Sequence, residues 1–423
     1  MLKLSKSIEL KNASWLIGGK VVQMILSLVV GIITARYLGP DNYGVINYVS
    51  AYLGFFTALC TLGINSVIVK EFVEYPDEQG EIIGTAIGLR LLSSVLSVVM
   101  IVSIIGIVDG REFLIVALLC SLALIFQVFN TFDYWFQAQY KSKIVAITSL
   151  VGYISISAYR IILLITEKSV EWFAFATSVD YICIALLLLI FYKINHGPRI
   201  SFSFKRAHEL LKSSYHYILS GMMVAIYGQT DKLMLKHMLN ESEVGYYSTA
   251  MAICGMWTFI LAAFVDALNP TIMRLHKTDY EGYKKKNRQL YCIVIYCSLI
   301  VSTVIMLLSD YIVFILYGEQ YMPASQPLKM ITWYTTFSYL GVARNAWLVC
   351  EKKQKYLKYM YIGAVFINIF LNSVFIPMWG TVGAAFASLV TQMCTSIILP
   401  CFIKELRPNV KLIIEAICLR KIK

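Results

Sequence analysis

Charged residues are scarce in this sequence. Only 15% of its 423 residues are Asp, Glu, Lys or Arg, whereas a soluble domain typically carries about 25%. This scarcity excludes a soluble enzyme made of two or three ordinary domains. The net charge of +12 does not indicate a nucleic-acid partner, because so apolar a chain offers no basic groove.

Motifs of common enzyme chemistry are missing as well. Gly18-Gly19-Lys20 lacks both the upstream glycine and the downstream Ser or Thr of a Walker motif. His208 and Glu209 are not followed by a second histidine at zinc-binding spacing, and no GxSxG elbow occurs. We therefore expect a chain that is not an enzyme and that holds neither a cofactor nor a bound metal.

Cysteine pairs are absent too. The ten cysteines include no CxxC pair, and nearly all of them lie inside apolar runs, so they offer no disulfide framework. We interpret them as small apolar core residues.

Long apolar runs dominate what is present. Hydrophobic residues make up 58% of the chain, and the mean hydropathy is +0.68. Because a membrane-spanning helix needs about 20 predominantly apolar residues, the runs predict an all-α polytopic membrane protein with about twelve transmembrane helices. These spans are expected near residues 14–36, 43–69, 82–108, 113–138, 144–166, 171–193, 214–237, 246–269, 289–316, 327–350, 358–378 and 381–403.

The positions of Lys and Arg predict the orientation, since cytoplasmic loops are enriched in both. If the amino terminus is cytoplasmic, the cytoplasmic segments hold twenty-seven of the 37 Lys and Arg residues. The outer loops then hold about four, and the others fall inside spans. An odd number of spans would destroy this alternation, so both termini are expected in the cytoplasm.

A long polar connection divides the chain into six spans plus six. We expect an N-terminal six-helix lobe over residues 1–192, a basic cytoplasmic linker over 193–213, and a C-terminal six-helix lobe with a cytoplasmic tail over 214–423. The linker contains Gly197 and Pro198, followed by a basic amphipathic stretch.

A faint internal repeat supports this division. Leu-x5-Gly followed by tyrosines occurs at Leu38 and Gly44, and it occurs again at Leu239 and Gly245. The two occurrences are 201 positions apart. The repeat favours two homologous bundles, as in many transporters.

Basic residues inside the spans are candidates for substrate binding, because a charge at mid-membrane costs about 2.5–3.5 kcal/mol. A lining rich in Lys and Arg suits an anion, and arginine in particular suits phosphate through its bidentate fork. The alternative is that the side chain snorkels to the interface, which is more reasonable for Lys20 than for the arginines. The candidates, with polar residues on the same helix faces, are Lys20 with Gln23, Arg90 with Ser94 and Ser97, Arg160, Lys232 and Arg344.

Acidic residues inside the spans are fewer. Asp180 lies deep in the sixth span, and Asp231 lies near the outer end of the seventh. A buried carboxyl group could take up a coupling proton or sodium ion. For Asp180 the alternative is a salt bridge to one of the intramembrane cations.

Two further patterns indicate helix packing. Gly84 and Gly88 form a GxxxG pair on a different side of the Arg90 helix, which indicates a packing face. Asn368 and Asn372 lie at i and i+4 in the eleventh span and extend the polar lining. Such a pair is more often glue between helices than a substrate contact.

Several segments together carry a resemblance to a known family. The segments are ARYLGPDNYGVINY (35–48), FDYWFQAQYKSK (132–143), QTDKLMLKHMLNESEVGYYSTA (229–250), ILYGEQY (315–321) and NIFLNSVFIPMWGTVGAAFAS (368–388). They are spread in order over nearly the whole chain and resemble the Wzx-type polysaccharide flippases. These are the O-antigen and capsule repeat-unit transporters of the MOP superfamily, which also contains the multidrug MATE exporters.

The resemblance implies a MATE-like pair of six-helix lobes around a central cavity. It also implies a flippase for undecaprenyl-pyrophosphate-linked oligosaccharide repeat units at the inner membrane of a bacterium. Membrane lipids, a coupling H⁺ or Na⁺ and other polysaccharide assembly proteins are the partners it suggests. These flippases share no universal functional residue, so the cationic positions named above are this sequence's own candidates.

Three other functions remain open at this point. A MATE-type small-molecule exporter is disfavoured by cationic rather than acidic spans. A lipid II flippase of the same superfamily is expected to have fourteen spans, whereas this sequence predicts twelve. A membrane-embedded glycosyltransferase would need acidic catalytic residues on long outer loops, and the longest such loop, near 317–326, carries only Glu319.

Overall fold

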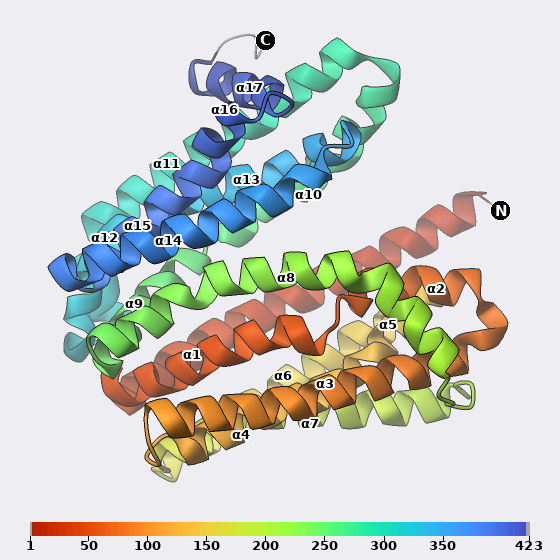
Figure 1. Cartoon of the computed structure of the whole chain (residues 1–423), viewed down its shortest axis with the longest axis horizontal. Helices are drawn as coiled ribbons and strands as arrows, with labels where there is room; N and C mark the ends of the chain where they lie inside the picture. The colour runs from red at the N-terminus through yellow and green to blue at the C-terminus, as the bar shows by residue number, and fades with distance from the viewer. Residues whose placement is uncertain (1, 420–423) are drawn as a thin grey trace. The chain divides into compact units, whose positions relative to one another are not determined.

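The computed structural model describes residues 2–419, with side chains from Met24 onward except at Ile25 and Ser220. Every regular element in this part of the chain is a helix, and no strand occurs in it (Figure 1). Nine helices among the described residues are long and apolar enough to cross a membrane. The expected all-α membrane architecture is confirmed.

The chain forms two compact units, and each is built from two stretches of sequence. Unit 1 comprises Met1–Leu38 and Val49–Ala225, and unit 2 comprises Gly39–Tyr48 and Ile226–Lys423. The unit boundaries therefore fall inside the two long helices α1 (Leu2–Cys60) and α8 (Phe204–Met238).

Unit 1 holds most of α1 and the first part of α8. Between them come three short elements and the apolar helices of the first half of the chain. In order these are η1 (Ile64–Ser66), α2 (Ile68–Glu74), η2 (Pro76–Glu78), α3 (Gln79–Val108), α4 (Leu114–Phe126), η3 (Gln127–Asn130), α5 (Thr131–Ala138), α6 (Ser142–Ile165) and α7 (Val170–Ile194).

Unit 2 holds the rest of α8, the middle of α1 and the helices of the second half. In order these are α9 (Glu241–Gly255), α10 (Thr258–Thr278), α11 (Tyr280–Tyr317), η4 (Glu319–Ala324), α12 (Ser325–Ile331), α13 (Tyr334–Cys350), η5 (Gln354–Tyr356), α14 (Leu357–Trp379), α15 (Thr381–Met393), the π-helical turn η6 (Cys394–Ile398), α16 (Leu399–Phe402) and α17 (Arg407–Ile417).

Besides the expected span near 43–69, which is interrupted after Cys60, where α1 ends, four of the expected spans are interrupted rather than continuous. Breaks occur between α4 and α5, between α9 and α10, between α12 and α13, and at the π-helical turn after α15. Each break frees backbone carbonyls, which inside a membrane need another partner. A polar side chain supplies it in each case. Thr131 Oγ1 donates to Val128 O at 2.8 Å, Thr258 Oγ1 to Gly255 O at 2.8 Å, Ser302 Oγ to Thr332 O at 2.8 Å, and Arg344 Nη1 to Thr395 O at 3.1 Å.

The helix α1 changes direction at Gly39. This residue has φ +72°, a left-handed conformation that glycine adopts without a Cβ clash, and Pro40 suits the first turn of the helix that follows. The segment after the kink packs closely on α9 within unit 2. A Cβ at Gly44 would meet the carbonyl of Glu241, and one at Gly245 would meet the carbonyl of Pro40.

In this contact, equivalent positions of the two copies of the sequence repeat approach one another. Gly44 and Gly245 are the repeat glycines, and each approaches the residue four positions before the other. At the centre, Ser242 Oγ donates to Asp41 Oδ1, and these two residues are also 201 positions apart. The two copies of the repeat therefore bind one another face to face.

The polar connection before α8 lies on α3 rather than free in solvent. A Cβ at Gly80 would meet the carbonyl of Arg199, and one at Gly84 would meet that of Ser201. The backbone N–H of Ser203 donates to Thr85 Oγ1 at 3.1 Å. The glycine face on α3 is thus a packing face, but it packs against extended chain and not against a helix.

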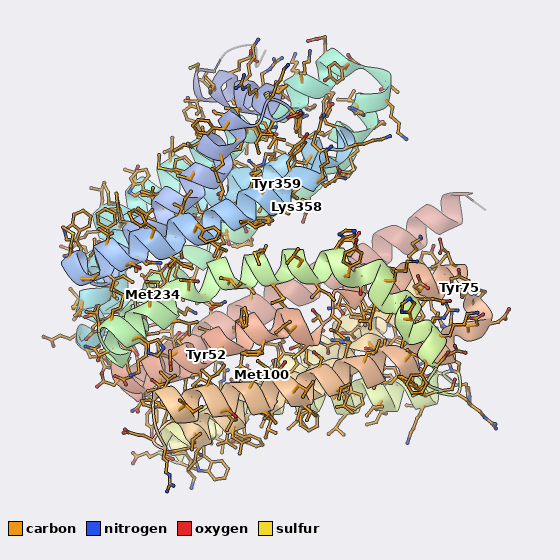
Figure 2. All side chains as sticks on the ribbon, in the orientation of Figure 1. Tyr52, Tyr75, Met100, Met234, Lys358 and Tyr359 are labelled. Atoms are coloured by element: carbon orange, nitrogen blue, oxygen red, sulfur yellow. The ribbon has the colours of Figure 1, made fainter. Side chains whose placement is uncertain are left out.

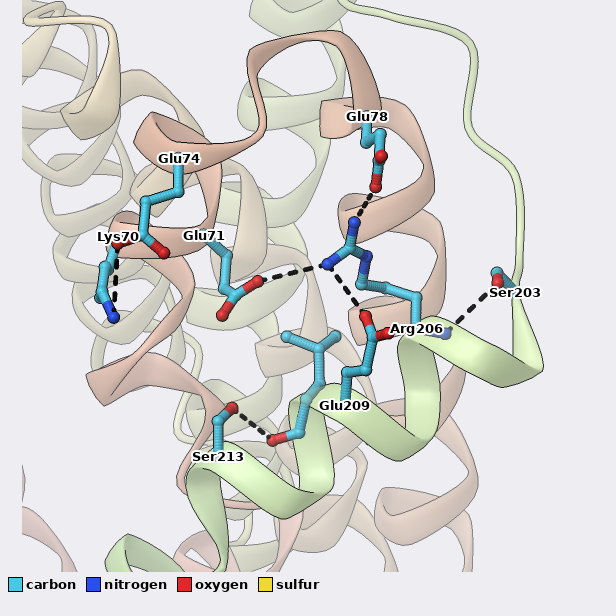
Figure 3. A network of polar contacts seen from close by, with 9 residues as sticks. Lys70, Glu71, Glu74, Glu78, Ser203, Arg206, Glu209 and Ser213 are labelled. Atoms are coloured by element: carbon cyan, nitrogen blue, oxygen red, sulfur yellow. Dashed lines mark hydrogen bonds and ion pairs between the residues drawn. The ribbon is translucent and has the colours of Figure 1, made fainter.

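Buried Arg206, near the start of α8, holds this connection to the end of unit 1. Its guanidinium pairs with Glu71 at 3.5 Å, with Glu209 at 3.1 Å and with Glu78 (Figure 3). It also lies over the ring of Tyr75, 4.5 Å from the centroid.

The expected carboxy-terminal tail contains an amphipathic helix, α17. It packs on α11, where Arg288 pairs with Glu415 at 2.8 Å and Asn409 Nδ2 donates to Tyr291 Oη at 2.7 Å. The apolar face of α17, with Val410 and Ile413, is buried in the core of unit 2.

Candidate functional site

Asp231 lies in the interior of unit 2, where its carboxylate accepts four hydrogen bonds. Asn368 Nδ2 donates to Oδ1 at 3.0 Å, and Asn372 Nδ2 donates to the same oxygen at 2.7 Å. Tyr247 Oη donates to Oδ2 at 2.6 Å, and Ser388 Oγ donates to it as well. Each carboxylate oxygen therefore receives two neutral donors. We call these five residues the Asp231 cluster.

Four helices build the Asp231 cluster. Asp231 comes from α8, Tyr247 from α9 and Ser388 from α15. Asn368 and Asn372 come from α14, where their i,i+4 spacing puts both amides on one face. The asparagine pair predicted from the sequence thus joins helices, as interhelical glue does, and it does so through a carboxylate.

The Asp231 cluster is closed to solvent. Asp231 is 6% exposed, Tyr247 is 2% exposed, Ser388 is 3% exposed, and both asparagines are fully buried. A buried carboxylate in an apolar bundle is costly, and hydrogen bonds from several directions reduce that cost. Lys232, the next residue on α8, is half-buried as a whole, and its ammonium is close enough for its charge to interact with that of Asp231.

The oxygen atoms of the Asp231 cluster are of the chemical type that holds a small hard cation. Besides the two carboxylate oxygens there are the hydroxyls of Tyr247 and Ser388 and the amide oxygens of the two asparagines. The Oδ1 atom of Asn372 is buried without a hydrogen-bond partner among the described residues. Because an amide can turn its oxygen in place of its nitrogen at little steric cost, this atom can be presented to a cation beside Asp231. Hard cations prefer such oxygen ligands.

A second polar layer lies one helical turn along α8 and α15. Gln392 Nε2 donates to Tyr227 Oη and also to Tyr334 Oη, the latter at 3.2 Å. Thr395 Oγ1 donates to Gln392 Oε1 at 3.2 Å. Beyond it, Arg344 donates from Nη1 to the carbonyls of Thr395 at 3.1 Å and of Ser396 at 3.3 Å. Arg344 thus holds the π-helical turn and is 3% exposed.

The turn between α8 and α9, which sets the spacing of Asp231 and Tyr247, is fixed by charge. Lys236 pairs with Glu241 at 2.7 Å. Burial disfavours the charged carboxylate of Glu241, but hydrogen bonds from Lys236 and from its own backbone N–H outweigh that effect and lower its pKa. Asn240 caps α9 by accepting from Glu243 N at 3.1 Å.

Arg90 lies in the interior of unit 1, where it ties α3 to η3 and α5. It is 1% exposed, donates from Nη1 to Thr131 Oγ1 at 2.8 Å and donates from Nη2 to the carbonyl of Gln127 at 3.3 Å. Ser94 and Ser97, from the same expected stripe, are also buried. Arg90 belongs to unit 1, whereas the Asp231 cluster belongs to unit 2.

Arg160 and Asp180 lie on two neighbouring helices of unit 1. Both are half-buried, and the charge of Arg160 on α6 acts on the carboxylate of Asp180 on α7. Lys20 and Gln23 lie outside the residues whose side chains the structure describes.

Two members of the Asp231 cluster were not predicted as site residues, namely Tyr247 and Ser388. Tyr247 lies in the repeat segment after Gly245, where tyrosines follow the glycine in both copies. That repetition was the only sequence signal for it. Ser388 follows a run of small residues on α15 and gives no signal of its own, because its role depends on which helix faces α8.

The chain is similar to known proteins in sequence and in fold. Residues 10–276 match the family model described as polysaccharide biosynthesis protein, and residues 217–374 match the MatE family model. The first match covers more than half of the chain, so the chain belongs to the polysaccharide biosynthesis protein family. None of the curated protein sequences matches it.

Solved structures share the fold at low sequence identity. A multidrug resistance MATE family transporter of the MOP superfamily in an inward-facing conformation has a TM-score of 0.71 at 14% identity, covering 93% of this chain and 96% of its own. The lipid II flippase MurJ, in an inward closed conformation, has a TM-score of 0.72 at 15% identity, covering 95% and 90%. A eukaryotic MATE transporter, AtDTX14, has a TM-score of 0.62 at 15% identity, covering 96% and 99%.

Proposed function

We propose that this member of the polysaccharide biosynthesis protein family is a flippase for undecaprenyl-pyrophosphate-linked oligosaccharide repeat units. It moves them by alternating access from the cytoplasmic to the outer leaflet of a bacterial inner membrane. Family membership and the fold shared with membrane transporters support transport. The sequence-wide resemblance to Wzx-type flippases supports this substrate.

The observation that carries the energy-coupling part of the proposal is the Asp231 cluster. A carboxylate that is buried in a membrane protein and held by four neutral donors is by default a candidate for a functional role. In this proposal a proton or sodium ion binds at Asp231 and leaves again during each transport cycle. Binding favours one of two conformations only as far as the ion's affinity for the two conformations differs.

The diphosphate of the substrate needs fixed cations, because moving unpaired charge through the bilayer costs many kcal/mol. We assign this role to Arg160, Lys232 and Lys20. Arg160 and Lys232 are half-buried, and such partly open side chains can exchange partners. Arg90 and Arg344 are nearly closed to solvent and bind carbonyls inside their units. In the proposal these two arginines hold helices in place.

Reconstitution tests the proposed transport directly. Purified protein in liposomes receives a defined undecaprenyl-pyrophosphate-linked oligosaccharide in one leaflet, and a membrane-impermeant glycosidase reports the fraction reaching the other leaflet. We expect protein-dependent exposure of the sugar that accelerates under an ion gradient. The matched control is Asp231→Asn, which should move less substrate and ignore the gradient. Equal exposure in protein-free liposomes would overturn the proposal.

Export of a small molecule is the second candidate, favoured by the MatE match over residues 217–374. It predicts gradient-driven uptake of cationic dyes into the same liposomes, with no exposure of the sugar. Dye transport without exposure of the sugar would replace the flippase proposal by this one.

The orientation is part of the proposal, and the distribution of Lys and Arg supports it. A reporter fused after Lys212 or Arg288 should report the cytoplasm, and one fused after Asn240 or Gln320 should report the outer side. Cytoplasmic accessibility at Asn240 would contradict the orientation.

A further inference from the structure

One end of unit 2 is strongly positive. We define this basic end as residues 274–288, 351–358 and 404–415, which lie at the α10–α11 turn, at the α13–α14 connection and along α17. These segments contain thirteen Lys and Arg residues against five Asp and Glu residues. The basic end therefore carries a net positive charge, because its acidic residues do not balance its basic ones.

The three segments of the basic end form one surface. Tyr280 Oη donates to Glu351 Oε1 at 3.2 Å and thereby joins the first segment to the second. Arg288 pairs with Glu415 at 2.8 Å and joins the first to the third. Figure 1 shows α17 and the α10–α11 turn at the same end of unit 2.

Lysines on the basic end are exposed and lie next to tyrosine rings. Lys358 lies 4.9 Å from the centroid of Tyr359, and Lys355 lies 5.2 Å from that of Tyr356. Tyr359 is 57% exposed, and Figure 2 labels it beside Lys358 on α14. Side chains with an apolar stem or ring and a polar tip are typical of the level of lipid head groups.

Unit 1 has no comparable excess at its linker end, which we define as residues 70–81, 133–143 and 193–212. Those segments contain eight Lys and Arg residues against seven Asp and Glu residues. Several of the charges are neutralised within the unit, because Arg206 alone contacts three carboxylates (Figure 3). Cytoplasmic segments are enriched in Lys and Arg whatever their content of Asp and Glu, and both ends meet that expectation. The enrichment therefore does not explain why the net positive charge lies on the basic end of unit 2.

We propose that the basic end of unit 2 binds the anionic phospholipid head groups of the membrane leaflet that it faces. Anionic leaflets attract lysine clusters near their surface, and each lysine strengthens binding about fivefold. The attraction falls off within a Debye length of about 10 Å at 0.1 M salt. It therefore needs several cations on one surface, as the basic end provides. The proposal does not depend on what the protein transports.

Two variants with the same number of neutralised lysines test this proposal. The basic-end variant combines Lys355→Gln, Lys358→Gln, Lys404→Gln and Lys411→Gln. The control variant combines Lys70→Gln, Lys193→Gln, Lys205→Gln and Lys212→Gln at the linker end. All eight side chains are exposed. Melting of the full-length protein in detergent is measured against increasing phosphatidylglycerol or phosphatidylcholine at 0.1 and 0.5 M salt.

We expect phosphatidylglycerol, but not phosphatidylcholine, to raise the melting temperature of the unchanged protein at the lower salt. The basic-end variant should need at least about tenfold more phosphatidylglycerol for half of the effect, since four cations of about fivefold each are removed. The control variant should need less than about twice the amount. If the basic-end variant does not accumulate, its two halves, Lys355→Gln with Lys358→Gln and Lys404→Gln with Lys411→Gln, are compared instead.

Three results would overturn the proposal. One is an unchanged phosphatidylglycerol effect in the basic-end variants, and another is an equal loss in the control variant. The third is stabilisation by a soluble polyprenyl diphosphate with none by phosphatidylglycerol, which would identify the bound phosphate as that of the transported lipid.

Discussion

Replacement of Asp231 by asparagine separates the charge of the Asp231 cluster from its shape. The new amide oxygen can still accept from Asn368 and Asn372. The new NH₂ group can donate to Tyr247 and Ser388, because their hydroxyls can reverse and accept. Every hydrogen bond that residue 231 makes therefore keeps a counterpart, and we expect Asp231→Asn to fold.

The expected cost in stability is comparable with the loss of ion binding, so the response to the ion, and not the stability alone, reports on the Asp231 cluster. A hydrogen bond to a charged group contributes about 1.5–3 kcal/mol and a neutral one about 0.5–1.5 kcal/mol. At about 1–1.5 kcal/mol for each bond, four weakened bonds cost about 4–6 kcal/mol, and removing a buried charge offsets part of that. An ion present at 100 times its dissociation constant stabilises the folded protein by about 2.7 kcal/mol. The substitution should remove that contribution entirely.

The assay is thermal unfolding of purified protein at increasing Na⁺ and, separately, at decreasing pH, with ionic strength held constant by choline chloride. The unchanged protein should melt higher as one of the two ions increases, and Asp231→Asn should show no such rise. Asp180→Asn is the matched control in unit 1 and should keep the rise. The reasoning is refuted if Asp231→Asn responds like the unchanged protein. It is also refuted if Asp180→Asn alone loses the response, since the coupling carboxylate would then be Asp180.

Three further predictions concern residues outside the Asp231 cluster. Arg160→Ala should stop surface glycan display at unchanged protein levels while Arg160→Lys keeps part of it, because charge survives without the bidentate fork; normal display in the alanine variant would remove Arg160 from the anion site. Arg90→Ala should instead lower stability by about 1–3 kcal/mol, because it leaves the buried carbonyl of Gln127 without this donor, and a normal melting temperature with lost transport would return Arg90 to the substrate path. Gly245→Ala should cost about 1–3 kcal/mol through overpacking against Pro40, and Gly228→Ala, where a Cβ meets nothing within 4 Å, should leave the melting temperature almost unchanged.

The helices could be predicted from the sequence because a membrane core imposes one simple requirement, an apolar run of sufficient length. The interruptions could not. The break after Gly255 and the π-helical turn after Met393 depend on side chains that satisfy the freed carbonyls. One of those side chains, Arg344, lies some fifty residues before the carbonyls that it binds.

The candidate site was predictable in part for a similar reason. Asp231 is recognisable as an acid inside an apolar run, and the spacing of Asn368 and Asn372 puts both on one helix face. Their meeting is a property of how α8 packs on α14, which the pattern of a single helix does not contain. Arg90 has the same sequence signature as a substrate-binding cation, yet its guanidinium donates to Thr131 and to the carbonyl of Gln127 within unit 1.

The reciprocal contact of Gly44 with Gly245 has a consequence for biosynthesis. Residues 39–48 belong to unit 2 although they are made before most of unit 1. Because a chain is synthesised at about 5–20 residues per second, α9 leaves the ribosome roughly ten to forty seconds after the segment of α1 that contains Gly44. Throughout that interval the carbonyls and glycines of this segment have no partner from unit 2, and only lipid, the insertion machinery or a chaperone can cover them. If a ribosome stalls between these two segments, the segment of α1 stays in the membrane without the helix that it packs against.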